Sequence, residues 1–151
     1  MAQVEASTQR EIAAGPGEVR AALADYRETR PKLLPEHYSE YEVREGGEGA
    51  GTVVHWKIQA TSKRVRDCLV DVTEPAGPGE GDLVESDRNS TMVTTWKIAP
   101  GAADGSSRVT VTTTWQGASG IGGFFERAFA PKGLARIYDE MLAKLAAETE
   151  K

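Results

Sequence analysis

Cysteine, histidine and long apolar runs are scarce in this sequence. The chain of 151 residues has one cysteine, Cys68, and two histidines, His37 and His55. A single cysteine allows no internal disulfide and no thiolate metal cluster. No apolar run approaches the ~20 residues that a membrane-spanning helix needs, and the first residues lack the basic and apolar regions of a secretory signal. We therefore expect a cytoplasmic protein without a membrane span.

Clustered positive charge is also missing. The net charge is −5, and the lysines and arginines are interleaved with acidic residues. Because nucleic-acid binding needs clustered Lys and Arg to displace counterions, we expect no nucleic-acid partner. Hydrophobic residues make up 39% and charged residues 27% of the chain, which is a globular composition. We expect one domain over residues 1–151, either as a monomer or as a dimer.

Hydrophobic periodicity predicts an α+β protein. Residues 4–12 alternate as a strand, and a short helix begins near Glu18 and ends by Pro31. From Tyr38 onward the apolar period is two, which predicts strands at residues 38–44, 52–60, 64–73, 83–87, 91–98 and 108–115.

The last part of the chain predicts a connector followed by a long helix. Residues 117–123 are rich in glycine, as in a flexible connector. Over residues 124–147 the apolar side chains form one continuous stripe at helical spacing, with a kink or a restart expected between Pro131 and Gly133. An antiparallel sheet has one face to cover, and this helix is the element left to cover it. We predict a curved sheet of six to seven strands wrapped around a long C-terminal helix, with short helices between the first two strands.

Two parts of the sequence resemble the START-related, birch-pollen-allergen-like superfamily (SRPBCC), whose architecture is the helix-grip fold. Residues 10–19 (REIAAGPGEV) and 22–26 (ALADY) look like the first strand of that superfamily running into its first helix. Residues 120–127 (GIGGFFER) and 134–138 (LARIY) look like its final helix. The resemblance covers nearly the whole chain and points to the bacterial polyketide cyclase/dehydrase and lipid transport group. It implies a cavity between the concave face of the sheet and the last helix, with an apolar or aromatic ligand such as a lipid, sterol, quinone or polyketide.

One face of the predicted sheet carries the tryptophans. Trp56, Trp96 and Trp115 each fall on the more apolar parity of their strand. Ordinary core packing also explains this parity, but in a helix-grip fold the same face lines the cavity. Thr94 and Thr113 on that face would add the sparse polar groups of a small-molecule pocket. The predicted ligand contacts are Val54, Trp56, Ile58, Met92, Thr94, Trp96, Val111, Thr113, Trp115, Phe125, Phe129, Leu134, Tyr138 and Met141.

Acidic residues in the strands are weak candidates for acid–base chemistry. Asp67 and Glu85 lie in strands whose inward parity the sequence leaves open, as do Asp71 and Asp87. An inward carboxylate would have a raised pKa, which suits proton transfer. Surface ion pairs between neighbouring strands are the alternative interpretation of all four residues.

Histidine and cysteine offer little further chemistry. His37 precedes Glu40 by three residues but lacks the second imidazole that a zinc site would need. His55 falls on the polar parity of its strand, as a surface residue or as a base near the mouth of the pocket. Cys68 fits a small buried apolar group better than a reactive thiol. We therefore expect neither a metal nor a cofactor.

The predicted function is the binding or transport of a hydrophobic small molecule, without turnover. The first alternative is an aromatase/cyclase that holds a polyketide in reactive geometry. The second is a protein-interaction module of the same fold. An inward Asp67 or Glu85 with a basic partner would support the cyclase. A filled cavity together with an exposed apolar patch would support the interaction module.

Overall fold

Seven strands and three helices make up the part of the chain that the structure, a computed structural model, describes: residues 3–61, 64–116 and 120–150. Their order is β1 (Gln3–Ile12), α1 (Pro16–Ala24), α2 (Thr29–Leu33), β2 (Tyr38–Glu45), β3 (Val53–Thr61), β4 (Arg64–Thr73), β5 (Leu83–Asp87), β6 (Val93–Pro100), β7 (Ser107–Gln116) and α3 (Gly120–Thr149).

The strands form one antiparallel sheet in the order β1-β7-β6-β5-β4-β3-β2. Strands β2 to β7 follow one another as a meander, and β1 joins the far side by pairing with β7, where Val4 lies opposite Trp115. Strand β7 shows the clearest alternation: Val109, Val111 and Thr113 are buried, and the threonines between them are half-buried. The period of two in the sequence therefore reports which face of the sheet points inward.

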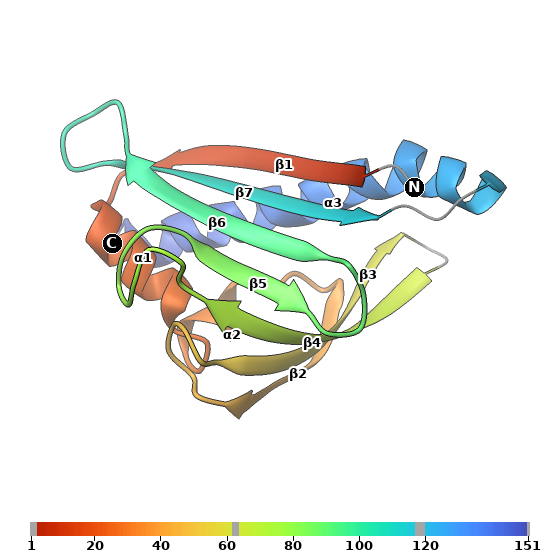
Figure 1. Ribbon diagram of the computed structural model, residues 1–151. Coiled ribbons are helices and arrows are strands. Elements are labelled where there is room, and N and C mark those ends of the chain that lie inside the picture. Colours follow the sequence, from red (N-terminus) through yellow and green to blue (C-terminus); the bar gives the residue numbers. More distant parts are fainter. Residues whose placement is uncertain (1–2, 62–63, 117–119, 151) are drawn as a thin grey trace.

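Helix α3 lies along the inner face of the sheet, and α1 and α2 gather at one end of it (Figure 1). The buried stripe of α3 comprises Leu134, Ile137, Met141 and Leu145, each at most 2% exposed. A helix that is apolar on one side and covers a sheet hides both apolar surfaces from water, which is the main stabilising term of such a fold. The predicted architecture is confirmed. None of the described helices is long and apolar enough to span a membrane.

The start of α3 differs from the prediction. The helix begins at Gly120 and runs without interruption through Pro131, so residues 120–123 are helical rather than a connector, and no restart occurs at Pro131. Residues 117–119 lie outside the described residues. Proline removes one backbone hydrogen bond from a helix, but tertiary packing of the apolar stripe that follows outweighs this local preference.

Candidate functional site

A small cavity lies between the inner face of the sheet and α3. Its lining consists of Arg30, Leu34, Tyr38, Trp56, Ile58, Glu85, Met92, Thr94, Trp96, Tyr138 and Met141. Its volume of about 20 Å³ leaves room for about one water molecule, whereas pockets for drug-sized ligands measure ~300–1,000 Å³. At this site, among the described residues, side chains therefore leave little free space.

The structure brings together about half of the predicted ligand contacts. Those that line the cavity are Trp56, Ile58, Met92, Thr94, Trp96, Tyr138 and Met141. Others are buried in the surrounding core without reaching the lining: Val54, Val111, Thr113, Trp115 and Leu134. The side chains of Phe125 and Phe129 lie outside the described part of the chain. The parity assigned to the three tryptophans is thus correct, and the cavity itself occupies the end of the sheet nearest α2.

A buried ion pair forms the polar end of the cavity. The Nη2 atom of Arg30 lies 2.8 Å from Oε2 of Glu85, and both side chains are 3% exposed. Glu85 also accepts hydrogen bonds from the hydroxyl of Tyr26 at 2.5 Å and from Nε1 of Trp96 at 3.1 Å. Three donors from α2, β6 and the segment after α1 therefore converge on one carboxylate of β5. Such a set compensates much of the cost of burying a charge.

The guanidinium of Arg30 lies between two aromatic rings. Its central carbon is 4.5 Å from the ring centre of Tyr26 and 5.0 Å from that of Trp96, which is cation–π geometry. Nη1 donates to the carbonyl of Leu23 at 3.0 Å. Nε is buried and has no hydrogen-bond partner among the described residues.

The charges at this end are held in place by their surroundings. Burial alone would lower the pKa of Arg30, but the negative charge of Glu85 raises it well above the ordinary value. Burial, reinforced by the charge of Glu85, raises the pKa of Tyr26 well above its usual range. Arg30 is therefore cationic and Tyr26 is a neutral donor.

Hydroxyl groups form a second polar cluster, beside the cavity. The hydroxyl of Tyr138 contacts that of Thr113, and Thr113 lies 2.7 Å from the hydroxyl of Thr94. Burial raises the pKa of Tyr138 to about 12, so its phenol stays neutral. Each hydroxyl can both donate and accept, and the cluster satisfies itself without any charge.

The remaining wall is aromatic. The ring of Trp56 is stacked on Tyr41, with ring centres 6.2 Å apart, and meets Tyr38 edge-on at 5.9 Å. The hydroxyl of Tyr41 donates to the carbonyl of Tyr26 at 2.6 Å. This bond connects β2 to the segment that leads into α2. The aromatic wall and the ion pair are therefore parts of one connected structure.

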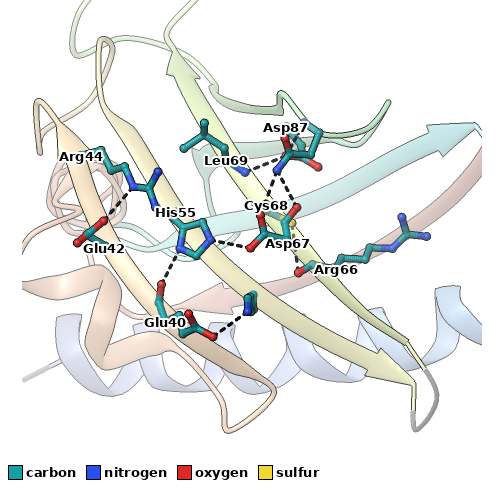
Figure 2. A network of polar contacts seen from close by, with 11 residues as sticks. Glu40, Glu42, Arg44, His55, Arg66, Asp67, Cys68, Leu69 and Asp87 are labelled. Atoms are coloured by element: carbon teal, nitrogen blue, oxygen red, sulfur yellow. Dashed lines mark hydrogen bonds and ion pairs between the residues drawn. The ribbon is translucent and has the colours of Figure 1, made fainter.

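The other acid–base candidate, Asp67, lies on the opposite face of the sheet. Figure 2 shows its carboxylate beside His55, with Oδ1 2.8 Å from Nε2, while Nδ1 of His55 lies 2.9 Å from the carbonyl of Glu40. Both ring nitrogens of His55 thus lie within hydrogen-bond distance of an oxygen atom. The hydrogen bond from His55 lowers the pKa of Asp67. Glu40 has a left-handed φ of 52° at a bulge in β2. This network belongs to the outer surface and does not reach the cavity.

The other reactive candidates are structural. Asp71 pairs with Arg88 at 2.7 Å on the outer face, and Asp87 accepts hydrogen bonds from the turn that follows β5. Surface pairing was thus a correct interpretation of Asp71 and of Asp67 beside His55, whereas Asp87 accepts hydrogen bonds from neutral groups and Glu85 is buried. Burial raises the pKa of the Cys68 thiol to about 12, so it is not a thiolate at neutral pH.

His37 is exposed at the surface. Among the side chains that the structure describes (residues 3–59, 65–116 and 131–150), no three His, Cys, Asp or Glu residues are placed to hold a metal ion.

The residues that the sequence did not indicate are Arg30, Leu34, Tyr38 and Tyr26. Arg30 stands between Thr29 and Pro31 in what reads as an irregular connector, where an arginine is ordinarily solvated. For Glu85, the partner of Arg30, the sequence did contain one indication of burial. Glu85 shares its parity with Leu83, an apolar residue two positions earlier in the same strand.

Several solved structures are similar to the chain. The solution NMR structure of the KanY protein is 48% identical, with a TM-score of 0.86, and the match covers 100% of both chains. The crystal structure of a Thermus thermophilus protein, TTHA0849, is 21% identical, with a TM-score of 0.75, over 96% of both chains. The Zhui aromatase/cyclase from Streptomyces sp. R1128 is 15% identical, with a TM-score of 0.74, over 99% of this chain and 94% of the other.

No curated protein matches the chain. The two more distant structural matches establish the fold alone. A family model described as "Polyketide cyclase / dehydrase and lipid transport" matches residues 1–150. This match over almost the full length shows that the chain belongs to the polyketide cyclase/dehydrase and lipid transport family.

Proposed function

We propose that the protein binds one small, largely apolar molecule in the cavity between the sheet and α3. The observation that carries the proposal is the Arg30–Glu85 ion pair in the lining of an otherwise apolar and aromatic cavity. Replacing a buried ion pair by packed apolar residues is often neutral or stabilising, so such a pair is weak evidence for stability. Buried charges beside a cavity are typical of functional sites, and few polar groups in an apolar lining are typical of small-molecule pockets.

A ligand would enter by displacing side chains that can adapt. Met92 and Met141 line the cavity, and unbranched thioether side chains adopt alternative rotamers at low cost. Leu34, Tyr38 and Met92 are half-buried, so the route from solvent passes between the segment after α2 and the start of β6. Lys144 of α3 donates to the carbonyl of Leu34 at 3.2 Å, which holds that segment over the cavity.

The experiment first identifies a ligand and then determines on which face of the sheet it binds. Native mass spectrometry of freshly purified protein detects a retained molecule, and thermal shift with a panel from fatty acids to aromatic ketones detects added ones. A ligand that binds only the folded state stabilises it by about 2.7 kcal/mol at a hundredfold excess over Kd.

Trp56→Ala should weaken this shift more than His55→Ala, because the two neighbouring side chains lie on opposite faces. Equal effects of the two substitutions, or no binding across the panel, would contradict the proposal.

A cyclase is the second candidate, because Glu85 faces inward and has a basic partner in Arg30. In a cyclisation, a base removes a proton from a methylene carbon, and a cation beside the developing enolate stabilises it. The enolate carbon then bonds to a carbonyl carbon, whose C=O π bond opens to an alkoxide that takes the proton back from the base. Glu85 would act as the base and Arg30 as the cation. The carboxylate of Glu85 already accepts from Tyr26, Trp96 and Arg30, so its oxygens are occupied by donors rather than facing a substrate C–H, which favours binding over turnover.

Proton abstraction can be measured separately from binding. In D₂O, a protein with an active base would exchange the methylene protons next to the carbonyl of 1-indanone faster than buffer does, and Glu85→Gln would lose the excess. Exchange at the buffer rate with the ligand bound would rule out this base.

The interaction module receives less support. Its cavity would be filled, as observed, but it also needs an exposed apolar patch. Among the side chains whose burial the structure describes, Val65 is the one large apolar residue that is exposed, at 56%. One residue makes no patch.

A further inference from the structure

The unpaired N–H of Arg30 is the feature of the cavity that the fold does not explain. A guanidinium has three nitrogen atoms, of which Nη1 is bound to the carbonyl of Leu23 and Nη2 to Glu85. Nε is buried without an acceptor among the described residues. The Arg30 side chain is 3% exposed and lines the cavity. A buried donor without a partner is unfavourable, and a ligand oxygen in the cavity is the acceptor that would relieve it.

The charges around the cavity decide what kind of oxygen fits. Arg30 and Glu85 balance each other, and burial raises the pKa values of Tyr38 and Tyr138, so both phenols stay neutral. The lining thus carries no net charge. An anionic ligand would be desolvated next to Glu85, and a cationic one next to Arg30. A neutral acceptor such as a carbonyl meets neither obstacle.

The shape of the lining adds the second requirement. Tyr38, Trp56 and Trp96 supply flat faces and edges around one small volume. Aromatic pairs gain from stacked or edge-to-face contacts beyond the area they bury. A flat ring system gains these contacts, whereas a flexible alkyl chain loses more conformational entropy when it is bound.

We propose that Nε–H of Arg30 is the polar anchor of the site and that the ligand is a neutral aromatic molecule whose carbonyl oxygen accepts this hydrogen bond. The inference rests on the proposed function, namely that the cavity binds a small molecule. Glu85 and the carbonyl of Leu23 hold the guanidinium through Nη2 and Nη1, and Nε is its one nitrogen without an acceptor in the described part of the chain. Fatty-acid anions are then poor ligands despite the cation in the wall.

The test compares three probes that share one ring system. 1-Indanone and indane differ in one position, where a carbonyl replaces a methylene group, and indane-1-carboxylate adds a charge. Titrations followed by NMR should give 1-indanone about tenfold tighter binding than indane, and indane-1-carboxylate no advantage over indane. The ¹H–¹⁵N signal of Nε in Arg30, assigned by its loss in Arg30→Lys, should move with 1-indanone and stay in place with indane.

Arg30→Lys keeps a cation beside Glu85 but has no N–H at the position of Nε. In this variant we expect the ratio of the affinities for 1-indanone and indane to fall to about one, while the affinity for indane itself changes by less than about twofold. Arg136→Lys, at an exposed position on α3, is the matched control and should keep the preference.

The outcomes separate this inference from the proposed function. Equal binding of 1-indanone and indane by the wild-type protein, with an unmoved Nε signal, would overturn the anchor but leave a binding cavity. Tighter binding of indane-1-carboxylate would overturn the neutral class. Failure of all three probes to bind would count against the inference and the proposed function together. If Arg30→Lys does not fold, the relative affinities of the three probes for the wild-type protein still decide.

Discussion

Removing Arg30 alone should be far more damaging than removing an arginine from the surface of the same sheet. Arg30→Met leaves Glu85 buried, at 4% exposure, without its cation. Breaking a buried pair from one side costs about 3–5 kcal/mol, a large part of the ~5–15 kcal/mol that stabilises a typical domain. Arg88→Met also breaks an ion pair, with Asp71, but these side chains are 48% and 41% exposed. Exposed pairs contribute little to stability, because solvent screens them.

The double variant Arg30→Met/Glu85→Gln shows whether the loss comes from the stranded charge. Glutamine keeps an oxygen that can accept from Tyr26 and Trp96 but carries no charge. We expect it to recover about 2 kcal/mol relative to Arg30→Met, because an uncharged buried amide with partners costs less than an unpaired carboxylate. Urea unfolding of the four proteins measures this directly. A double variant no more stable than Arg30→Met, or an Arg30→Met variant no worse than Arg88→Met, would refute the reasoning.

Two further predictions concern packing and pH. Met141→Lys places a charge at a position 2% exposed on the inner side of α3 and should lower the free energy of unfolding by about 3 kcal/mol or more. Ala143→Lys, on the exposed side of the same helix, should leave the melting temperature nearly unchanged. Similar melting temperatures of the two variants would contradict the packing of α3. Burial alone would raise the pKa of Glu74, but hydrogen bonds from the backbone of Ala50 and from Arg20 lower it below its ordinary value of 4.5. A carboxylate with a lowered folded pKa contributes stability that is present above its ordinary pKa and lost as the pH falls through the folded value. The difference in free energy of unfolding between the wild type and Glu74→Gln should therefore shrink below about pH 4.5. A difference that stays constant until the protein unfolds in acid would show that Glu74 does not titrate as described.

Local patterns were sufficient for the fold because the sheet and the last helix each hide one face. Strand β7 alternates so regularly that its inward residues can be read from the sequence, and the stripe from Leu134 to Leu145 defines the covering helix. Glycine content misled the prediction at residues 120–123, where a helix forms. Glycine lowers helix propensity by about 1 kcal/mol per residue, an amount that tertiary contacts can override.

The site was less predictable because its polar residues depend on contacts across the chain. Glu85 and Arg30 are 55 positions apart, and their pairing follows from how α2 is held against α1 and α3 rather than from any local pattern. The volume of the cavity likewise depends on contacts between distant parts of the chain. The sequence indicates which residues face inward, such as Trp56 and Met141, but whether they meet or leave a space depends on their rotamers. Parity therefore located the lining, and only the structure shows that it is nearly closed.

The most direct test of the central claim follows the two methionines that line the cavity. The chain has three methionines, and ¹³C-methyl labelling gives Met92 and Met141 separate NMR signals, from opposite sides of the cavity. A titration with 1-indanone should shift both signals saturably and with the same dissociation constant, because aromatic rings strongly alter the resonances of methyl groups that they contact. If 1-indanone binds and neither methionine signal moves at saturation, the cavity between the sheet and α3 is not the binding site.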